Sequence, residues 1–218
     1  MARKTKAAKA AERIRGVGSL DEAREWLGGR RIEEIECVVP DQAGVARGKI
    51  MPVAKFLAAP TMSMPGSIFT QTIAGEWPTD DTAFENDKAD QDILLEPDFS
   101  TLSVVPWEQD PTAQLIHDAY HSDGRPLEIA PRQVLRRVVE LYENQGWKPV
   151  VAPEIEFYLV KPNKDPDYPL EPPSGRSGRP ESARQSYSIA AVNEFDELFD
   201  DIYKMSEAQD LEIDTLIH

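Results

Sequence analysis

The sequence predicts an α+β protein in which strands with one apolar face pack with a few amphipathic helices. Apolar and polar side chains alternate in segments such as 34–39, which is the period of a half-buried strand. Segments 131–146 and 195–205 instead place apolar residues three and four positions apart, which is the period of a helix packed on one side. Because the strand patterns alternate, we expect a sheet with one open face and not a fully buried parallel sheet.

The composition of the chain is that of a soluble globular protein. It has 218 residues, of which 40% are hydrophobic and 29% are charged. Its 39 acidic and 24 basic residues give a net charge of −15, which argues against nucleic acid or an anionic membrane as the main partner. No apolar run approaches the roughly 20 residues of a membrane span. The single cysteine, Cys37, excludes an internal disulfide and fits a cytoplasmic protein, and we expect it in the core.

The N-terminus is basic, unlike the rest of the chain. Its first 15 residues carry a net charge of +5, so the remainder carries −20. We expect residues 1–18 to form a disordered basic tail. Polyanion binding or a targeting role are the alternatives, although this segment lacks the apolar core of a secretory signal.

The first half of the chain opens with a helix signal and continues with strand patterns. Ser19 and Glu22 have the spacing of a capping box, which predicts a helix that begins after Ser19 and ends at Gly28-Gly29. The further elements expected in this half are a strand at 34–39, a hairpin turn at 41–44, a return strand at 47–51, an irregular excursion at 60–92, and strand-like segments at 94–107 and 114–119.

The second half alternates helix and strand patterns around a proline-rich loop. Pro131 suits the first turn of a helix that we expect to end at Gly146. A loop at 161–186, a helix at 195–205 with an acidic first turn, and a strand pattern over 211–218 follow. That last pattern reaches His218 without a turn or cap, so we expect the chain to be part of a longer polypeptide.

The segment APEIEFYLV, at 152–160, predicts a strand with an unusual polar face. Side chains alternate along a strand, so Glu154 and Glu156 share one face, opposite the apolar face that carries Ile155 and Phe157. Their Cα atoms are about 6.6 Å apart at a rise of roughly 3.3 Å per residue. Two interpretations follow from the residues alone. Either this face is solvated, or a hard divalent cation such as Mg²⁺ or Mn²⁺ lies between the carboxylates and removes their repulsion.

Segments in both halves of the chain resemble the glutamine synthetase family. In order they are IECVVPDQAGVARGKIMP, ILLEPDFSTLSVVPW, APRQVLRRVVE, APEIEFYLV and LEIDTLIH. Each is weakly specific by itself, whereas their order and spacing together are specific. The resemblance covers about residues 19–218 and is nearest to the γ-glutamylpolyamine synthetases and related glutamate–amine ligases.

The resemblance implies a two-domain architecture and a ring-shaped assembly. Residues 19–125 would form a β-grasp-like N-terminal domain. Residues 126–218 would form the truncated start of a catalytic domain, which in the family is a curved antiparallel sheet with helices. Members of the family form homo-oligomeric rings, usually dodecamers, whose active sites lie between the catalytic domain of one subunit and the N-terminal domain of its neighbour.

The resemblance also implies a chemistry. In the family, ATP phosphorylates the γ-carboxylate of glutamate, an amine then displaces the phosphate, and two Mg²⁺ or Mn²⁺ ions neutralise the accumulating charge. By comparison, Glu154 would bind the ion nearer the transferring phosphoryl group and Glu156 the ion nearer the substrate. Asp214 matches an acidic position near the nucleotide, with a solvated acid as the alternative. His218 matches a histidine beside a further metal-binding glutamate and is expected in the substrate site by this comparison alone.

One segment departs from the family pattern. Ammonia-using members have a Phe-Asp-Gly-Ser-Ser segment leading to a Trp, and its Asp binds and deprotonates ammonium. Here FTQTIAGEWP carries Phe69 and Trp77 in register, with Thr70 at the Asp position. A hydroxyl cannot accept a proton from a cation as a carboxylate does. We therefore expect a bulkier primary amine, with Thr70 in its site; the alternative is that Phe69 and Trp77 only pack a loop.

The sequence thus predicts a cytoplasmic, ATP-dependent glutamate–amine ligase, of which these residues are an incomplete and by themselves inactive portion. No catalytic side chain is expected among them. Ordinary glutamine synthetase with ammonia as substrate is one alternative. A family member that only assembles or binds is the other.

Overall fold

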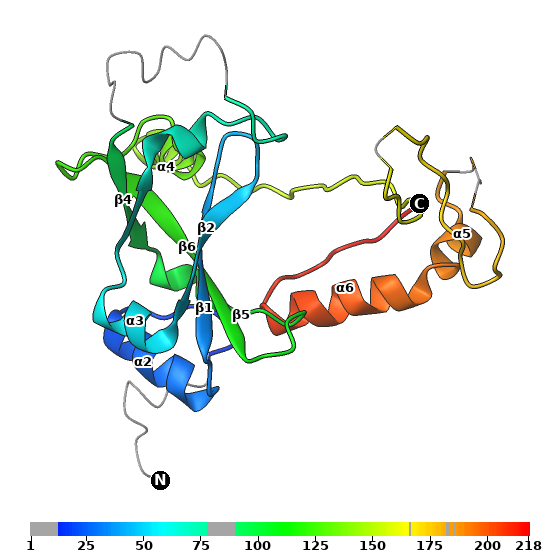
Figure 1. The fold of residues 1–218 in the computed structure, drawn as a ribbon, viewed down its shortest axis with the longest axis horizontal. Coiled ribbons are helices and arrows are strands. Elements are labelled where there is room, and N and C mark those ends of the chain that lie inside the picture. Colours follow the sequence, from blue (N-terminus) through cyan, green and yellow to red (C-terminus); the bar gives the residue numbers. More distant parts are fainter. Residues whose placement is uncertain (1–12, 78–89, 166, 182–183, 185) are drawn as a thin grey trace. The chain divides into compact units, whose positions relative to one another are not determined.

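The structure is a computed structural model that describes residues 13–77, 90–165, 167–181, 184 and 186–218 (Figure 1). Contacts divide the chain into two compact units, Met1–Pro149 and Val150–His218. The domain boundary expected at residue 125 remains a prediction, because a boundary between contact clusters does not test where a homologous domain begins. Within the described ranges, no helix is both long and apolar enough to cross a membrane.

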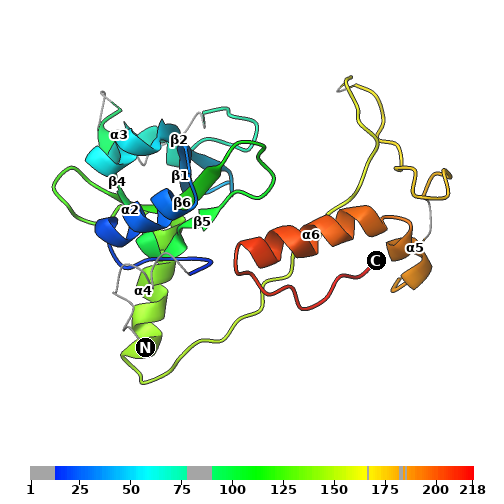
Figure 2. The ribbon, with the colours of Figure 1, turned by 90° about the horizontal axis from the view of Figure 1, so that it is seen from below.

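The described residues of the first unit form one sheet and three α-helices, and the structure is α+β as predicted (Figures 1 and 2). In chain order its elements are α2 (Leu20–Gly29), β1 (Glu34–Pro40), β2 (Ala46–Pro52), α3 (Val53–Ala58), β3 (Met62–Pro65), the 3₁₀ turn η1 (Gly66–Phe69), β4 (Asp92–Pro97), η2 (Phe99–Thr101), β5 (Ser103–Val104), β6 (Thr112–Tyr120) and α4 (Pro131–Glu143).

Strand β6 is the centre of the sheet. The order is β2-β1-β6-β4-β3, with β5 also paired to β6. The first half of β6 runs parallel to β1, and its second half runs antiparallel to β4. The remaining pairs are antiparallel, including the predicted β1–β2 hairpin. The sheet is therefore mixed, and the β-grasp-like description of this region remains a prediction.

The core lies on one face of this sheet, beneath α2 and α3. In β1, Ile35, Cys37 and Val39 are buried while the residues between them are half-buried, as the alternating pattern predicts. Burial raises the pKa of the Cys37 thiol to about 12, so this cysteine is a packing residue and not a nucleophile. Helix α3, which the sequence analysis missed, places Phe56 in the same core.

The predicted capping box at the start of α2 is confirmed. The hydroxyl oxygen of Ser19 accepts a hydrogen bond from the Glu22 backbone N–H at 3.3 Å. The Glu22 carboxylate accepts in turn from the Gly18 N–H at 2.8 Å, one position earlier than the capping-box pattern expects. Trp26 and Leu27, on the inner side of α2, are fully buried.

Residues 13–18 correct the predicted extent of the basic tail. The backbone of Gly16 and Val17 donates to the carbonyls of Leu102 and Phe99, at 2.8 and 2.9 Å. The Arg13 carbonyl accepts from the Trp26 indole N–H at 2.9 Å. This segment is therefore packed on the unit, because its backbone finds partners there, while residues 1–12 lie outside the described residues.

Helix α4 is attached to the sheet by a charged cluster of four residues, Asp98, Asp118, Arg132 and Arg136. Arg132 donates to Asp118 at 2.8 Å and also pairs with Asp98. Arg136, one turn later, pairs with the same two carboxylates, at 3.1 Å from Asp98. The cluster joins the first turns of α4 to β6 and to the start of η2, and the helix signalled by Pro131 is confirmed.

The buried imidazole of His117 in β6 is expected to have a lowered pKa in the folded protein. Its Nε2 lies 3.3 Å from the Pro60 carbonyl, so Nε2–H is the donor, while Nδ1 is buried without a hydrogen-bond partner among the described residues. Burial lowers the pKa of His117 below its ordinary value, and the contact with Pro60 opposes this only in part. In the unfolded chain this histidine binds a proton below about pH 6.5, whereas in the folded chain it binds one less readily. The free energy of unfolding should therefore fall as the pH drops below that value. Titration of the His117 ring by NMR checks this: a folded-state midpoint at or above that of the urea-unfolded chain would contradict it.

The second unit contains α5 (Ile189–Asn193) and α6 (Asp196–Ala208). Helix α6 confirms the predicted second amphipathic helix, with Asp196 and Glu197 in its first turn. Among the described residues of this unit, only Ala191 is buried.

The predicted strands at 152–160 and 211–218 are not present, and these two predictions are wrong for this structure. The β pairing among the described residues of the second unit is an isolated bridge between Ser174 and Pro180. A strand needs a neighbour for its backbone hydrogen bonds. Alternating sequence therefore leaves both segments extended but unpaired here.

Candidate functional site

Glu154 and Glu156 lie in an extended segment of the second unit that contacts little else. Both residues are exposed, and so are Ile155 and Phe157 on the intended apolar side, at 83% and 53%. The alternation that suggested paired carboxylates is present in the sequence, but no sheet holds the two side chains on one face. Both carboxylates are exposed to solvent here, and their role as metal ligands remains a prediction.

Asp214 and His218 lie in the last segment of the same unit. The Asp214 carboxylate accepts a hydrogen bond from the hydroxyl of the adjacent Thr215 at 3.0 Å. The His218 carbonyl accepts from the Tyr187 N–H at 2.7 Å, which ties the end of the segment to the residues before α5. Both residues are exposed, so neither side chain lies in an enclosed site.

Glu154 and Glu156 have the right type of ligand atom for a hard cation, but two carboxylates are too few to complete its coordination. Carboxylate oxygens are what Mg²⁺ and Mn²⁺ prefer. However, no cluster of three or more His, Cys, Asp or Glu that could hold a metal occurs among the described residues. Two exposed carboxylates leave most positions of an octahedral ion to water. The residues described here do not by themselves make a metal centre.

The segment around Thr70 is held by the 3₁₀ turn η1, which directly precedes Thr70. Phe69 is fully buried in the core of the first unit, so its side chain is a packing anchor. Thr70 follows as the C-terminal cap of η1, and its hydroxyl donates to the Ser67 carbonyl at 3.0 Å. Trp77 is 53% exposed, so it does not share the packing role of Phe69.

Asp90 is a residue near this segment that the sequence analysis missed. Its carboxylate accepts from the Ser67 N–H at 3.1 Å and from the Ser67 hydroxyl at 2.6 Å. It thus caps η1 from a position 23 residues further along the chain. No local pattern signals this contact, because nothing in the sequence indicates which acid returns to the turn. The Asp90 carboxylate therefore lies against Ser67, three residues before Thr70.

Comparison with known proteins identifies the family. The family model described as the catalytic domain of glutamine synthetase matches residues 128–218. A glutamate–isopropylamine ligase of a Pseudomonas species is 35% identical over 143 residues, which is 63% of this chain and 30% of the relative. The chain belongs to the glutamine synthetase family. Because amine ligases are among its relatives, it lies near the glutamate–amine ligase branch.

Two further relatives extend this family assignment. The gamma-glutamylputrescine synthetase PuuA of Escherichia coli is 27% identical over 80% of this chain and 37% of its own length. A glutamine synthetase of Thermus thermophilus is 31% identical over 72% of this chain and 35% of its own length. A solved structure of GmaS without ligand shares the fold, with a TM-score of 0.53 at 19% identity, over 87% of this chain and 39% of that one.

This family member spans between 30% and 37% of the length of these three curated relatives. Glu154, Glu156, Asp214 and His218 all lie within residues 128–218, the part that matches the catalytic-domain model. Thr70 lies outside it, in the first unit.

Proposed function

We propose that this chain is part of an ATP-dependent ligase that joins glutamate to a primary amine through γ-glutamyl phosphate. The observation that carries the proposal is its 35% identity over 143 residues to a glutamate–isopropylamine ligase. In the proposed reaction, a γ-carboxylate oxygen of glutamate attacks the terminal phosphorus of ATP and ADP leaves. The amine nitrogen then attacks the activated carbonyl, phosphate leaves, and the nitrogen loses a proton.

The surroundings of Thr70 support an amine with an apolar body. The hydroxyl hydrogen of Thr70 is used by the Ser67 carbonyl, so the side chain offers a neutral oxygen and no negative charge. Ammonium is bound by ionic contacts and hydrogen bonds alone, whereas an aliphatic amine also gains about 0.8 kcal/mol for each methylene it buries. Two or three methylenes could therefore replace the missing ionic contact.

Ammonia-dependent glutamine synthesis is the second candidate, and two observations favour it. Glutamine synthetases are among the relatives, including that of Thermus thermophilus at 31% identity. In addition, the Asp90 carboxylate lies against Ser67 in the turn that carries Thr70, at 2.6 Å from the Ser67 hydroxyl. A carboxylate there could bind ammonium in place of the absent aspartate.

Amine preference separates the two candidates. The protein expressed from its complete coding sequence is expected to show higher kcat/KM with an aliphatic mono- or diamine than with ammonia. Thr70→Asp should shift the ratio of the two values toward ammonia by at least about tenfold, because a charge-assisted hydrogen bond contributes about 1.5–3 kcal/mol. Phosphate release from ATP with glutamate and each amine measures both values.

Thr70→Asn is the matched control, because it has the size of aspartate without the charge, and it should leave the ratio unchanged. Wild-type preference for ammonia would establish the second candidate. Absence of phosphate release with every amine would instead favour a family member that only assembles or binds.

We further propose that Glu154 and Glu156 bind Mg²⁺ or Mn²⁺ once other ligands complete the site, with Asp214 near the nucleotide and His218 in the substrate site. The cations would neutralise charge on the phosphates and carboxylate. The 218-residue chain should bind Mn²⁺ only weakly, with a Kd on the order of millimolar, because two exposed carboxylates supply few ligands.

Titration of Mn²⁺ into the complete protein tests the metal role directly. Glu156→Gln should weaken binding by at least about tenfold. Glu207→Gln, a glutamate of α6 outside the proposed metal site, is the control and should have no effect. Equal affinity in all three proteins would refute the role of Glu156.

The proposal includes a cytoplasmic location and a homo-oligomeric ring, by analogy with the family. Sedimentation analysis of the complete protein tests the assembly, and a dodecamer is the expected species. A monomer with full activity would contradict an active site shared between subunits.

A further inference from the structure

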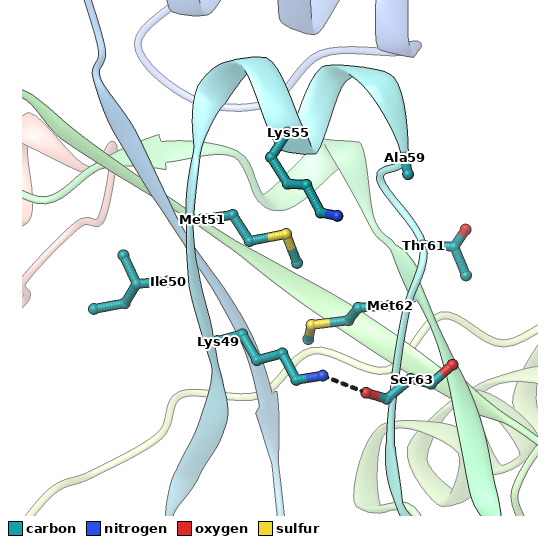
Figure 3. Close-up of a pocket in the computed structure, with 8 residues that line it drawn as sticks. All are labelled: Lys49, Ile50, Met51, Lys55, Ala59, Thr61, Met62 and Ser63. Atoms are coloured by element: carbon teal, nitrogen blue, oxygen red, sulfur yellow. Dashed lines mark hydrogen bonds between the residues drawn. The ribbon is translucent and has the colours of Figure 1, made fainter.

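The first unit has a pocket between the two edges of its sheet, on the side of α3. Strands β2 and β3 are the ends of the strand order, yet they come close enough for a side chain of one to hydrogen-bond the backbone of the other (Figure 3). The ammonium group of Lys49 in β2 donates to the Ser63 carbonyl in β3 at 2.7 Å (Figure 3). The pocket has a volume of about 550 Å³ and is lined by Lys49, Ile50, Met51, Lys55, Ala59, Thr61, Met62 and Ser63.

Two thioethers form the apolar part of this pocket. Met51 and Met62 are 8% and 6% exposed, and their side chains point into the space between β2 and the segment that leads to β3 (Figure 3). Methionine is flexible and polarisable, so it adapts to apolar groups of different shape. This pocket wall therefore suits a hydrocarbon body and offers it few hydrogen-bonding groups.

Two lysines supply the charge. The Lys55 ammonium, from α3, points into the same space as the thioethers (Figure 3). Among the described residues it has no hydrogen-bond or ion-pair partner, unlike Lys49. The pocket therefore places an exposed, unpaired ammonium group beside an apolar wall.

We propose that this pocket binds a small amphipathic carboxylate, with the carboxylate at Lys55 and Lys49 and the hydrocarbon body against Met51 and Met62. The volume lies within the range of about 300–1,000 Å³ usual for small-molecule sites, and the lining divides evenly between apolar side chains and polar or charged ones, as an amphipathic ligand requires. Lysine ammoniums act as point charges and suit a single carboxylate. The pocket shares no residue with the proposed ligase site, so the two proposals fail independently.

Methionine methyl NMR on the 218-residue chain tests this proposal with octanoate as the probe. The chain has five methionines, and only Met51 and Met62 line the pocket. Their methyl signals should shift on titration with octanoate, while that of Met205 in the second unit stays in place. Octanamide, which lacks the charge, and acetate, which lacks the body, should each bind at least about tenfold more weakly. Each methylene buried in the pocket contributes about fourfold in affinity.

Variants of Lys55 identify the charge contact. Lys55→Gln should weaken octanoate binding by about fivefold or more, and Lys55→Arg should retain it. Lys148→Gln, at an exposed lysine away from the pocket lining, is the matched control and should bind as wild type. Unchanged methyl spectra of the free variants show that the fold is intact. The proposal is overturned if octanoate moves neither methyl, moves all of the methyls together as a detergent would, or binds Lys55→Gln as tightly as wild type.

Discussion

Gly48→Ala is expected to destabilise the first unit by about 3 kcal/mol or more, the largest effect of any single methyl group that we foresee in this chain. Gly48 lies in β2 directly opposite Val38 of β1. A Cβ built on Gly48 would lie 2.0 Å from the Cys37 carbonyl oxygen and 2.9 Å from its carbonyl carbon. Both are backbone atoms, so no side-chain rotation can relieve the overlap.

Relief of this overlap would require β1 to move, and β1 cannot move freely. It pairs with β2 on one side and with the central strand β6 on the other. Its buried residues Ile35, Cys37 and Val39 also belong to the core. Separation of β1 from β2 would break ladder hydrogen bonds, and movement of both strands together would disturb close packing.

Urea unfolding followed by circular dichroism measures this effect as a change in midpoint at constant slope. Gly28→Ala is the control, because a Cβ there meets nothing within 4 Å and Gly28 lies in α2. It should be neutral or should stabilise the protein by up to about 1 kcal/mol, from helix propensity. Equal stability of Gly48→Ala and wild type would show that β2 can shift without cost.

Local sequence signals correctly predicted the helix starts and the buried strand face that depend on neighbouring residues. The Ser19 and Glu22 spacing predicted α2, and Pro131 predicted the start of α4, because caps and first turns depend on residues within one helical turn. The alternation at 34–39 likewise predicted the buried face of β1.

Strand pairing could not be derived in the same way. Glu36 of β1 lies beside Gln114 of β6, and the two side chains hydrogen-bond at 2.7 Å across 78 positions of sequence. Periodicity tells which face of a strand is apolar, but not which strand lies beside it. For the same reason, the alternation at 152–160 predicted a strand where the structure provides no partner.

The candidate site shows the same division between local and distant information. Thr70 could be identified from its segment, and the structure adds that its hydroxyl is held by Ser67. Asp90, by contrast, reaches Ser67 from 23 residues away, and the Lys55 pocket depends on the close approach of β2 and β3. The roles of Glu154 and Glu156 came from resemblance to the family and remain predictions.

Asp118→Asn is expected to cost about 2–3 kcal/mol of stability and to loosen α4 from the sheet. Asp118 is the most buried member of the charged cluster, with an 8% exposed side chain, whereas Arg132 and Arg136 are 24% and 51% exposed. Removal of one partner from a buried ion pair costs about 3–5 kcal/mol. We expect less here, because Asp98 still neutralises both arginines and water screens Arg136.

The second carboxylate of the cluster gives this attachment a pH dependence. Burial alone would raise the pKa of Asp98, but the hydrogen bond from Ser100 and the charges of Arg132 and Arg136 outweigh it and lower the pKa. The stabilisation is therefore complete above the ordinary aspartate pKa of about 3.9 and is lost as the pH falls through the lowered value.

Urea unfolding of Asp118→Asn, Arg132→Gln and the double variant measures the coupling between these residues. A coupling energy of about 1 kcal/mol or more is expected, together with faster amide exchange in the first turns of α4. Asp123→Asn is the control: Asp123 pairs with Arg125 at 2.8 Å, but the two side chains are 55% and 63% exposed, so its loss should cost far less stability than Asp118→Asn. If Asp118→Asn is no more costly than Asp123→Asn, then apolar packing and the hydrogen bond from Gln133 to the Ala119 carbonyl hold α4 in place without the charges.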